Sequence, residues 1–367
     1  MVVPRPRPGI LEIAPYVGGR AELEDGRPVV KLSANESALG PSPKAVEAYR
    51  EAAQHLHRYP DGGCRRLRQA IGRRLNLDPE RIVCGAGSDE LIGLLVRAYV
   101  GPGEEVLMSR YGFLMYRIAA LAAGAYPVLA PECDLKADVS ALLAHVTSRT
   151  RICFIANPNN PTGSYLRGDE LEALRRGLPD DVLLVVDAAY AEFVDAEDYS
   201  DGLDLARRHD NVVVTRTFSK LHGLAALRLG WLYAAPPVVD VLARIRNPFN
   251  VGTPAQAAGI AAIEDVAHQE RARRHNLLWR PWLARQLEGL GLRVYPSVAN
   301  FLLVAFPEEP GRDAAAAAAA LERHGLIPRR MEEYGLPDCL RITVGLEADN
   351  RRLVEVLSGF LEREGRG

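Results

Sequence analysis

Four residues close together in the sequence could act on a phosphorylated aldehyde: Thr217, Ser219, Lys220 and Arg228. Two hydroxyls and an arginine can hold a dianionic phosphate, and a lysine amine beside them can attack a carbonyl carbon. These residues follow the β-branched run 212–215, which is typical of a buried strand. A lysine here could also be plain surface charge. The pattern indicates a covalent site for an aldehyde with its own phosphate, provided that other segments supply the remaining contacts.

A glycine-rich turn, Cys84-Gly-Ala-Gly-Ser-Asp-Glu90, lies between a predicted strand at 81–84 and a predicted helix at 89–100. Such a turn can offer the backbone amides of Ser88 and Asp89 to a phosphate. It lacks the third glycine of the dinucleotide fingerprint, and no ribose-binding acid follows the next strand. An ordinary strand-to-helix turn explains this segment equally well when it is considered alone.

Groups that suit a heteroaromatic ring follow other predicted strands. Asp187 ends the apolar run 182–186, and a buried carboxylate needs a partner such as a protonated ring nitrogen. Tyr190 can reach the same ring, and Asn160 can donate to a phenolate oxygen. Phe113 could cover the ring face, although core packing explains it as well. A magnesium-binding role for Asp187 is disfavoured because the chain lacks GxxxxGK[ST].

Short apolar runs alternate with longer amphipathic segments in the middle of the chain. The alternation predicts an α/β domain whose mainly parallel sheet lies between helices. Because ligands of such sheets bind beyond the carboxyl ends of the strands, the chemically active residues are expected to meet there. The predicted strands are 81–84, 105–108, 151–155, 182–186 and 211–214, with helices at 89–100 and 116–123.

Three segments are expected along the 367 residues, since this length exceeds one typical core. Residues 1–32 contain several X-Pro steps and predict an extended N-terminal arm. Residues 33–250 predict the large domain, and residues 251–367 a smaller α+β C-terminal domain. Within the latter, the alanine run 314–320 predicts a helix capped by Asp313.

The composition disfavours several classes of function. The formal net charge of −2 gives no reason to expect nucleic acid or an anionic membrane as a partner. No apolar run approaches the roughly 20 residues that span a bilayer, and the first ten residues lack an apolar signal core, so a cytoplasmic location is expected. The five cysteines contain no CxxC pair, and the eight histidines show no metal-ligand spacing, so we expect no metal site.

Together these motifs resemble the fold-type I pyridoxal phosphate (PLP)-dependent aminotransferases of class II, and within them the histidinol-phosphate aminotransferases. The resemblance extends over nearly the whole chain. The likeness to the superfamily rests on Asn160-Pro-Thr-Gly163, on Ser219-Lys220 and on Arg228, eight residues after the lysine. The likeness to the histidinol-phosphate branch rests on the Pro-Tyr motif at 15–16, the Arg-Tyr-Pro motif at 58–60 and the segment 340–345. The matching segments are 14–19, 32–36, 58–62, 85–90, 157–163, 187–190, 216–220, 223–228, 334–337 and 340–345.

The resemblance implies PLP as cofactor and roles for residues around it. Lys220 would form a Schiff base with the cofactor and then move a proton between the substrate α-carbon and the cofactor. Asp187 would keep the pyridine nitrogen protonated. Asn160 and Tyr190 would bind the phenolic oxygen, and Phe113 would stack on the ring. The residues implied to hold the phosphate are Ser88, Asp89, Thr217, Ser219 and Arg228.

Substrate and partner contacts are implied in the same way. Arg341 would bind the carboxylate of glutamate, and Arg329 would help to bind the phosphate of the second substrate. Tyr16 and Asn35 would line the substrate side. Tyr59 would reach the phosphate site of a neighbouring subunit, which implies a homodimer with shared sites.

The chain departs from the family pattern in two places. Ala188 stands where Asp-Glu-Ala-Tyr is frequent, and we expect it to point away from the ring. Ser37-Ala38 replaces Asn-Pro after Asn35-Glu36, which could alter how the arm closes. In addition, Arg329 and Arg330 are adjacent, and either could face the substrate.

The implied activity is reversible amino transfer between L-glutamate and imidazole acetol phosphate, a step of histidine biosynthesis. One alternative is an aromatic amino acid aminotransferase, in which Arg246–Val251 would form an apolar pocket floor. A second is a PLP-dependent threonine-phosphate decarboxylase. A third, a PLP-sensing module of a transcription factor, is disfavoured because the sequence contains no helix-turn-helix segment.

Overall fold

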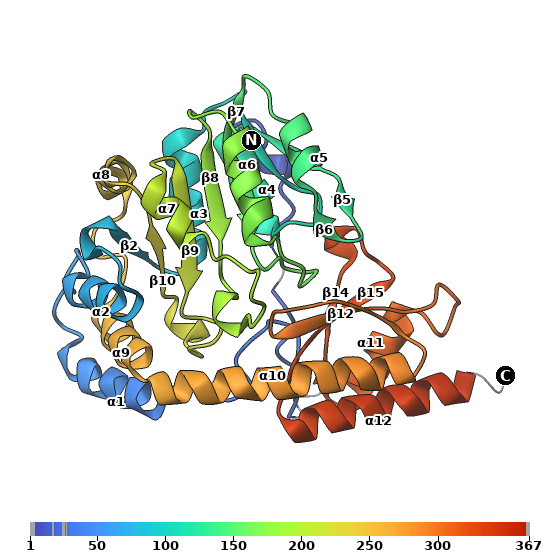
Figure 1. Cartoon of the computed structure of the whole chain (residues 1–367). Coiled ribbons are helices and arrows are strands. Elements are labelled where there is room, and N and C mark those ends of the chain that lie inside the picture. The colour runs from blue at the N-terminus through green and yellow to red at the C-terminus, as the bar shows by residue number, and fades with distance from the viewer. Residues whose placement is uncertain (1–3, 17, 24–25, 27, 365–367) are drawn as a thin grey trace.

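A mainly parallel sheet forms the centre of the larger part of the molecule (Figure 1). The computed structural model describes residues 4–16, 18–23, 26 and 28–364. Strand β10 runs antiparallel to both of its neighbours, and all other neighbouring strands of this sheet pair in parallel. In spatial order the strands are β2 (Ile82–Gly85), β10 (Gly230–Tyr233), β9 (Val212–Thr217), β8 (Leu183–Asp187), β7 (Thr150–Ala156), β3 (Glu105–Ser109) and β4 (Tyr126–Ala130).

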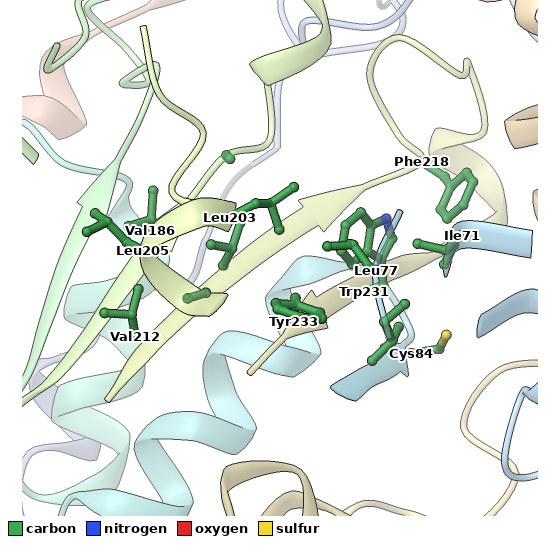
Figure 2. Close-up of a cluster of buried hydrophobic side chains, with 14 of the residues drawn as sticks. Ile71, Leu77, Cys84, Val186, Leu203, Leu205, Val212, Phe218, Trp231 and Tyr233 are labelled. Carbon is green, nitrogen blue, oxygen red and sulfur yellow. The ribbon is translucent and has the colours of Figure 1, made fainter. Parts of the chain in front are cut away.

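Side chains on alternate positions of the strands enter two separate core layers, as strand geometry requires. Leu184 and Val186 of β8 pack in the layer that also receives buried residues of α2, α6, α7 and α9. Leu183 and Val185 pack in the opposite layer, with α3, α4 and α8. Figure 2 shows part of the first layer, where Val186 lies close to helix α7. Because both faces are covered, the central positions of the strands are mostly hydrophobic, and the polar residues lie mainly toward the strand ends.

The helices confirm the α/β prediction and include the two that the sequence indicated, at α3 and α4. Asp313 caps α11 as predicted, with its carboxylate accepting from the amide of Ala316 at 2.8 Å. The helices are α1 (Pro43–Ala52), α2 (Arg65–Leu75), α3 (Ser88–Tyr99), α4 (Leu114–Ala123), α5 (Val139–Ala144), α6 (Gly168–Gly177), α7 (Leu203–Arg208), α8 (Pro236–Ile245), α9 (Thr253–Glu264), α10 (Val266–Gly289), α11 (Ala314–Arg323) and α12 (Glu347–Glu364).

A second, antiparallel sheet forms the smaller part of the molecule, where α11 and α12 lie (Figure 1). Its strands are β11 (Arg293–Tyr295), β12 (Phe301–Ala305), β15 (Cys339–Thr343) and β14 (Arg329–Arg330). Two short pairs complete the strands: β1 (Val30–Lys31) with β13 (Leu326–Ile327), and β5 (Glu132–Cys133) with β6 (Lys136–Ala137). Through β1, the end of the N-terminal arm is attached to the smaller part.

Packing divides the chain at α10, the long helix that extends beneath both parts in Figure 1. Ala258 and Ala262 of α9 belong to the core of the large sheet. The core of the smaller part instead contains Leu283 and Leu287 from the second half of α10, together with Leu32. The sequence placed the boundary at residue 251. We propose a boundary within α10, because α9 packs with the large domain.

Candidate active site

One cavity collects nearly all of the predicted site residues at the carboxyl ends of the parallel strands. It lies where β2, β7, β8 and β9 end and where the arm and the small sheet approach them. Tyr59 is the predicted site residue that is not part of its lining. The predicted residues that line it are Tyr16, Asn35, Ser88, Asp89, Phe113, Asn160, Asp187, Tyr190, Thr217, Ser219, Lys220, Arg228, Arg329 and Arg341.

Asp187, the last residue of β8, is the buried acid of the cavity. Its two carboxylate oxygens accept hydrogen bonds from the hydroxyl of Tyr116 at 2.7 Å and that of Thr215 at 2.9 Å. Loss of water contact raises its pKa to about 6, while these two bonds act in the opposite direction. A cation placed against Asp187 would favour the charged carboxylate, as a protonated ring nitrogen would.

Lys220 follows β9 and presents its amine to the same cavity. Its Nζ donates to the backbone oxygen of Ala34 at 3.0 Å and lies 5.5 Å from the centre of the Tyr190 ring. Burial lowers the pKa of Lys220 to about 8, and the nearby charge of Arg341 acts in the same direction. The neutral, nucleophilic form of the amine is therefore accessible near neutral pH.

The glycine-rich turn and the end of β9 form one end of the cavity, where a cation and the first amides of a helix could bind an anion. Arg228 donates to Ser219 Oγ at 3.4 Å and pairs with Asp89 at 2.9 Å. The helix α3 begins at Ser88, so its first amides point out of the helix. The φ of Gly87 is +86°, a conformation that favours glycine, and a Cβ there would lie 2.5 Å from the guanidinium of Arg228 and displace it.

Asn35 and Tyr190 connect the cavity to the arm and the small sheet. The amide of Asn35 donates to the Tyr190 hydroxyl at 3.0 Å, and its backbone N–H donates to Thr343 Oγ1 at 3.0 Å. The Tyr190 ring packs edge-on against Phe301 of β12. The segment around Asn35 is thereby fixed to both parts of the molecule.

Arg341 on β15 forms a second cationic end. It is buried and donates to Asn160 Oδ1 and to the backbone oxygen of Ser33 at 2.6 Å. Its Nε is buried without a hydrogen-bond partner, and no acidic side chain of the described residues forms an ion pair with it. Such an unpaired donor suits an anionic ligand.

The structure distinguishes the two adjacent arginines. Arg329 lines the cavity and lies 5.9 Å from the centre of the Tyr16 ring. Arg330 does not line the cavity and has an exposed side chain. Both arginines form an ion pair, Arg329 with Glu333 and Arg330 with Glu332. Antiparallel pairing places Arg329 opposite Arg341, so the two cations lie on neighbouring strands.

Two sequence expectations concern residues outside this cavity. The proposed apolar floor at 246–251 is wrong for the cavity of this subunit, since no residue of that segment lines it. Phe249 instead stacks on Tyr59, with ring centres 4.7 Å apart, and the Tyr59 side chain is 83% exposed. Ala188 is fully buried in a core layer and does not line the cavity.

Sequence reasoning missed three residues at this site: Tyr116, Thr215 and Tyr334. Thr215 had a detectable signal, because it is a polar residue within an apolar strand and pairs in register with Asp187. Tyr116 lies one helical turn beyond Phe113, but the reach of its hydroxyl to Asp187 depends on how α4 packs. Tyr334 lines the cavity from the small domain.

The donor set fits a phosphorylated pyridine aldehyde. The cavity is lined by the amine of Lys220, the buried acid Asp187, the first residues of helix α3 and the guanidinium of Arg228. The Nε of Arg341, which also lines it, has no hydrogen-bond partner. The described residues contain no cluster of three or more His, Cys, Asp or Glu suited to a metal ion. No helix in the described part of the chain is long and apolar enough to cross a membrane.

Comparison with known proteins agrees with this geometry. A family model described as aminotransferase class I and II matches residues 27–357. Histidinol-phosphate aminotransferase of Paramagnetospirillum magneticum is 59% identical over 361 residues, covering 98% of this chain and 99% of the relative. That of Rhodospirillum centenum is 56% identical over 359 residues, with the same coverage of each chain.

Solved structures extend the likeness to three dimensions. The histidinol-phosphate aminotransferase of Sinorhizobium meliloti, in complex with pyridoxal-5'-phosphate, is 31% identical with a TM-score of 0.87, covering 97% of each chain. Aspartate aminotransferase of Thermus thermophilus with maleate, at 23% identity and a TM-score of 0.81, covers 92% of each chain and shares the fold. The chain therefore belongs to the class I and II aminotransferases and, within them, to the histidinol-phosphate aminotransferase family.

Proposed function

We propose that this chain uses PLP to transfer the amino group of L-glutamate to imidazole acetol phosphate, yielding 2-oxoglutarate and L-histidinol phosphate. The observation that carries this proposal is that Lys220, the buried acid Asp187 and the cationic residue Arg341 line one cavity. The names of the relatives support histidinol phosphate as one of the substrates.

The residues divide the chemistry among them. When bound, PLP accepts the amino group and delocalises the electron pair of the substrate α-carbon. Asp187 would hold the ring nitrogen, and Asn160 and Tyr190 the phenolic oxygen. Lys220 would take the α-proton and return it to the cofactor side, which requires a neutral amine. The phosphate would be bound by Ser88, Asp89, Thr217, Ser219 and Arg228.

Arg341 and Arg329 would select the substrates. Arg341 presents an unpaired Nε from a buried position, which suits the carboxylate of glutamate. Arg329 lines the cavity beside Tyr16, where it would bind the phosphate of the second substrate. The two substrates would thus use different cations while reacting at the same lysine.

A homodimer with shared sites is part of the proposal. Tyr59 lies outside the cavity of its own subunit and its side chain is largely exposed. Stacking on Phe249 holds its ring in place. This arrangement supports the expectation that Tyr59 contacts the phosphate of a neighbouring subunit. The cytoplasmic location expected from the sequence stays a prediction.

A half-reaction tests the proposed activity. PLP-loaded protein is mixed with L-histidinol phosphate, and the visible band of the lysine-linked cofactor is followed as it converts to the amino form. Conversion to the amino form is expected. Threonine phosphate is tested separately, and release of carbon dioxide from it would indicate the decarboxylase. Comparing imidazole acetol phosphate with phenylpyruvate as acceptor tests the aromatic alternative; preference for phenylpyruvate would contradict the proposed substrate.

A further inference from the structure

Glu90 and Asn250 connect the phosphate-binding turn to the segment that carries Tyr59. Glu90 lies in the first turn of α3, and its Oε2 accepts from the backbone N–H of Ala86 at 2.6 Å. The side chain thus reaches back across the turn that leads from β2 into the helix. A carboxylate in the first turn also interacts favourably with the positive end of the helix dipole.

Asn250 donates a hydrogen bond to the same carboxylate oxygen of Glu90. Its Nδ2 donates to Glu90 Oε2 at 2.6 Å and to the backbone oxygen of Cys84 at 3.4 Å. Cys84 and Ala86 flank Gly85, so both ends of this short stretch are fixed by one carboxylate–amide pair. Neither Glu90 nor Asn250 lines the cavity, so any action on a ligand there passes through the turn.

Arg246 extends the contacts toward Tyr59. Its guanidinium donates to Asn250 Oδ1 at 3.1 Å and to the backbone oxygen of Gly62 at 2.7 Å. Gln256 donates to the backbone oxygen of Asp61 at 2.9 Å. The segment 246–250, which does not form the expected apolar floor of the cavity, therefore joins the 59–62 segment to the turn before α3.

We propose that Glu90 and Asn250 are positioning residues that set the amides of Ser88 and Asp89 for the cofactor phosphate. Without the carboxylate, the N–H of Ala86 and the amide of Asn250 lose a shared acceptor, and the turn gains freedom. Binding then costs more conformational entropy, because the turn must be ordered by the ligand itself. This inference rests on the proposed function, since it assumes that the phosphate of PLP binds at this turn.

The test compares ligands with and without the phosphate. Holoenzyme and its Glu90→Ala variant are stripped of cofactor, and the dissociation constants of PLP and of unphosphorylated pyridoxal are measured by absorbance titration. We expect Glu90→Ala to weaken PLP binding about ten- to hundredfold, the range for a charge-assisted hydrogen bond, and to leave pyridoxal binding unchanged. Equal effects on both ligands, or none on PLP, would overturn the proposal.

Glu104→Ala is the matched control. Glu104 also accepts a backbone N–H, from Gly101 at 2.7 Å, but precedes β3 at the opposite end of the sheet. Glu104→Ala should leave the dissociation constants of PLP and of pyridoxal unchanged. If Glu90→Ala unfolds, Glu90→Gln is used in its place, with a smaller selective loss of PLP affinity expected; loss of pyridoxal affinity to the same extent would again contradict the proposal.

A double variant tests the pairing of the two residues. Glu90→Ala, Asn250→Ala and the double variant are compared. Because Asn250 is proposed to act mainly through the Glu90 carboxylate, with a 3.4 Å bond to the backbone oxygen of Cys84 besides, the loss of PLP affinity in the double variant should be clearly smaller than the sum of the two single losses. Additive losses of PLP affinity would mean that Glu90 and Asn250 act separately, and would contradict their proposed joint action on the turn. If the unmodified protein binds neither PLP nor pyridoxal, the proposed function fails, and this outcome is distinct from all of those above.

Discussion

The two cationic ends of the cavity are built in different ways. Arg228 is half exposed and already paired with Asp89 at 2.9 Å. Arg341 is buried, its Nε is unpaired, and burial lowers its pKa. An exposed pair can exchange Asp89 for a phosphate with little rearrangement, whereas a buried unpaired cation holds a strong preference for an incoming anion. Activity should therefore be more sensitive to substitutions around the buried Arg341 than to substitutions around the half-exposed Arg228.

The largest effect is expected for Lys220→Ala. Removing the amine eliminates both the covalent attachment and the proton carrier, so turnover and the visible band of the attached cofactor should be lost. Absorbance spectra and the glutamate half-reaction measure this. Lys44→Ala, at an exposed lysine on α1, should behave as the unmodified protein. Retention of both properties by Lys220→Ala would refute the proposed role.

Asp187→Asn is expected to lower kcat about 10²- to 10³-fold, the range for loss of a preorganised electrostatic contact. The amide keeps the shape of the side chain but cannot hold a protonated ring nitrogen by charge. Steady-state kinetics with glutamate measure the effect. Circular dichroism serves as a check on folding, and an unchanged kcat would mean that the buried acid does not act on the cofactor.

Arg329→Ala should raise KM for the phosphorylated substrate about ten- to hundredfold, corresponding to loss of a charge-assisted contact. Arg330→Ala is the matched control, because Arg330 is also an ion-paired arginine of β14 but is exposed and does not line the cavity. The KM of Arg330→Ala for the phosphorylated substrate should stay unchanged. The reverse result would show that the adjacent arginine binds the substrate in solution.

The pH dependence of cofactor uptake tests the environment of Lys220. Its pKa is lowered from 10.5 to about 8 by burial, and only the neutral amine attacks an aldehyde. The rate of PLP uptake by cofactor-free protein should therefore rise about tenfold from pH 7 to pH 9 and then level off. Arg341→Met removes a neighbouring positive charge and should move the midpoint upward. A midpoint near 10 in the unmodified protein would contradict a buried amine.

The smallest effect is expected for Thr215→Val. This change removes one hydrogen bond to Asp187, at 2.9 Å, while preserving shape in the core of β9. A neutral donor contributes about 1 kcal/mol, so kcat should fall about fivefold. Thr150→Val, at a buried threonine at the start of β7, is the control for a core hydroxyl distant from the cavity. Equal losses in the two variants would assign the effect to packing.

Much of the fold followed from local patterns. The apolar runs that became β2, β3, β7, β8 and β9 were identified because each is short, buried on both faces and followed by a turn or a helix. Strand β10 (Gly230–Tyr233) is not predicted, because it does not fit the alternation of strands and helices: no α-helix separates it from β9, with which it pairs antiparallel. Its place between β2 and β9 depends on pairing with strands distant in the sequence.

By itself, the sequence determined which residues are proposed to provide the chemistry: the lysine, the nearby residues proposed to bind the phosphate, and the acid at the tip of a buried strand. These were recognisable because each motif combines a local backbone geometry with a reactive side chain. The tertiary structure decided which of Arg329 and Arg330 faces the cavity, that Tyr116 and Thr215 hold Asp187, and that Phe249 packs on Tyr59. Such contacts join segments far apart in the chain, and the packing that brings them together leaves no local pattern in the sequence.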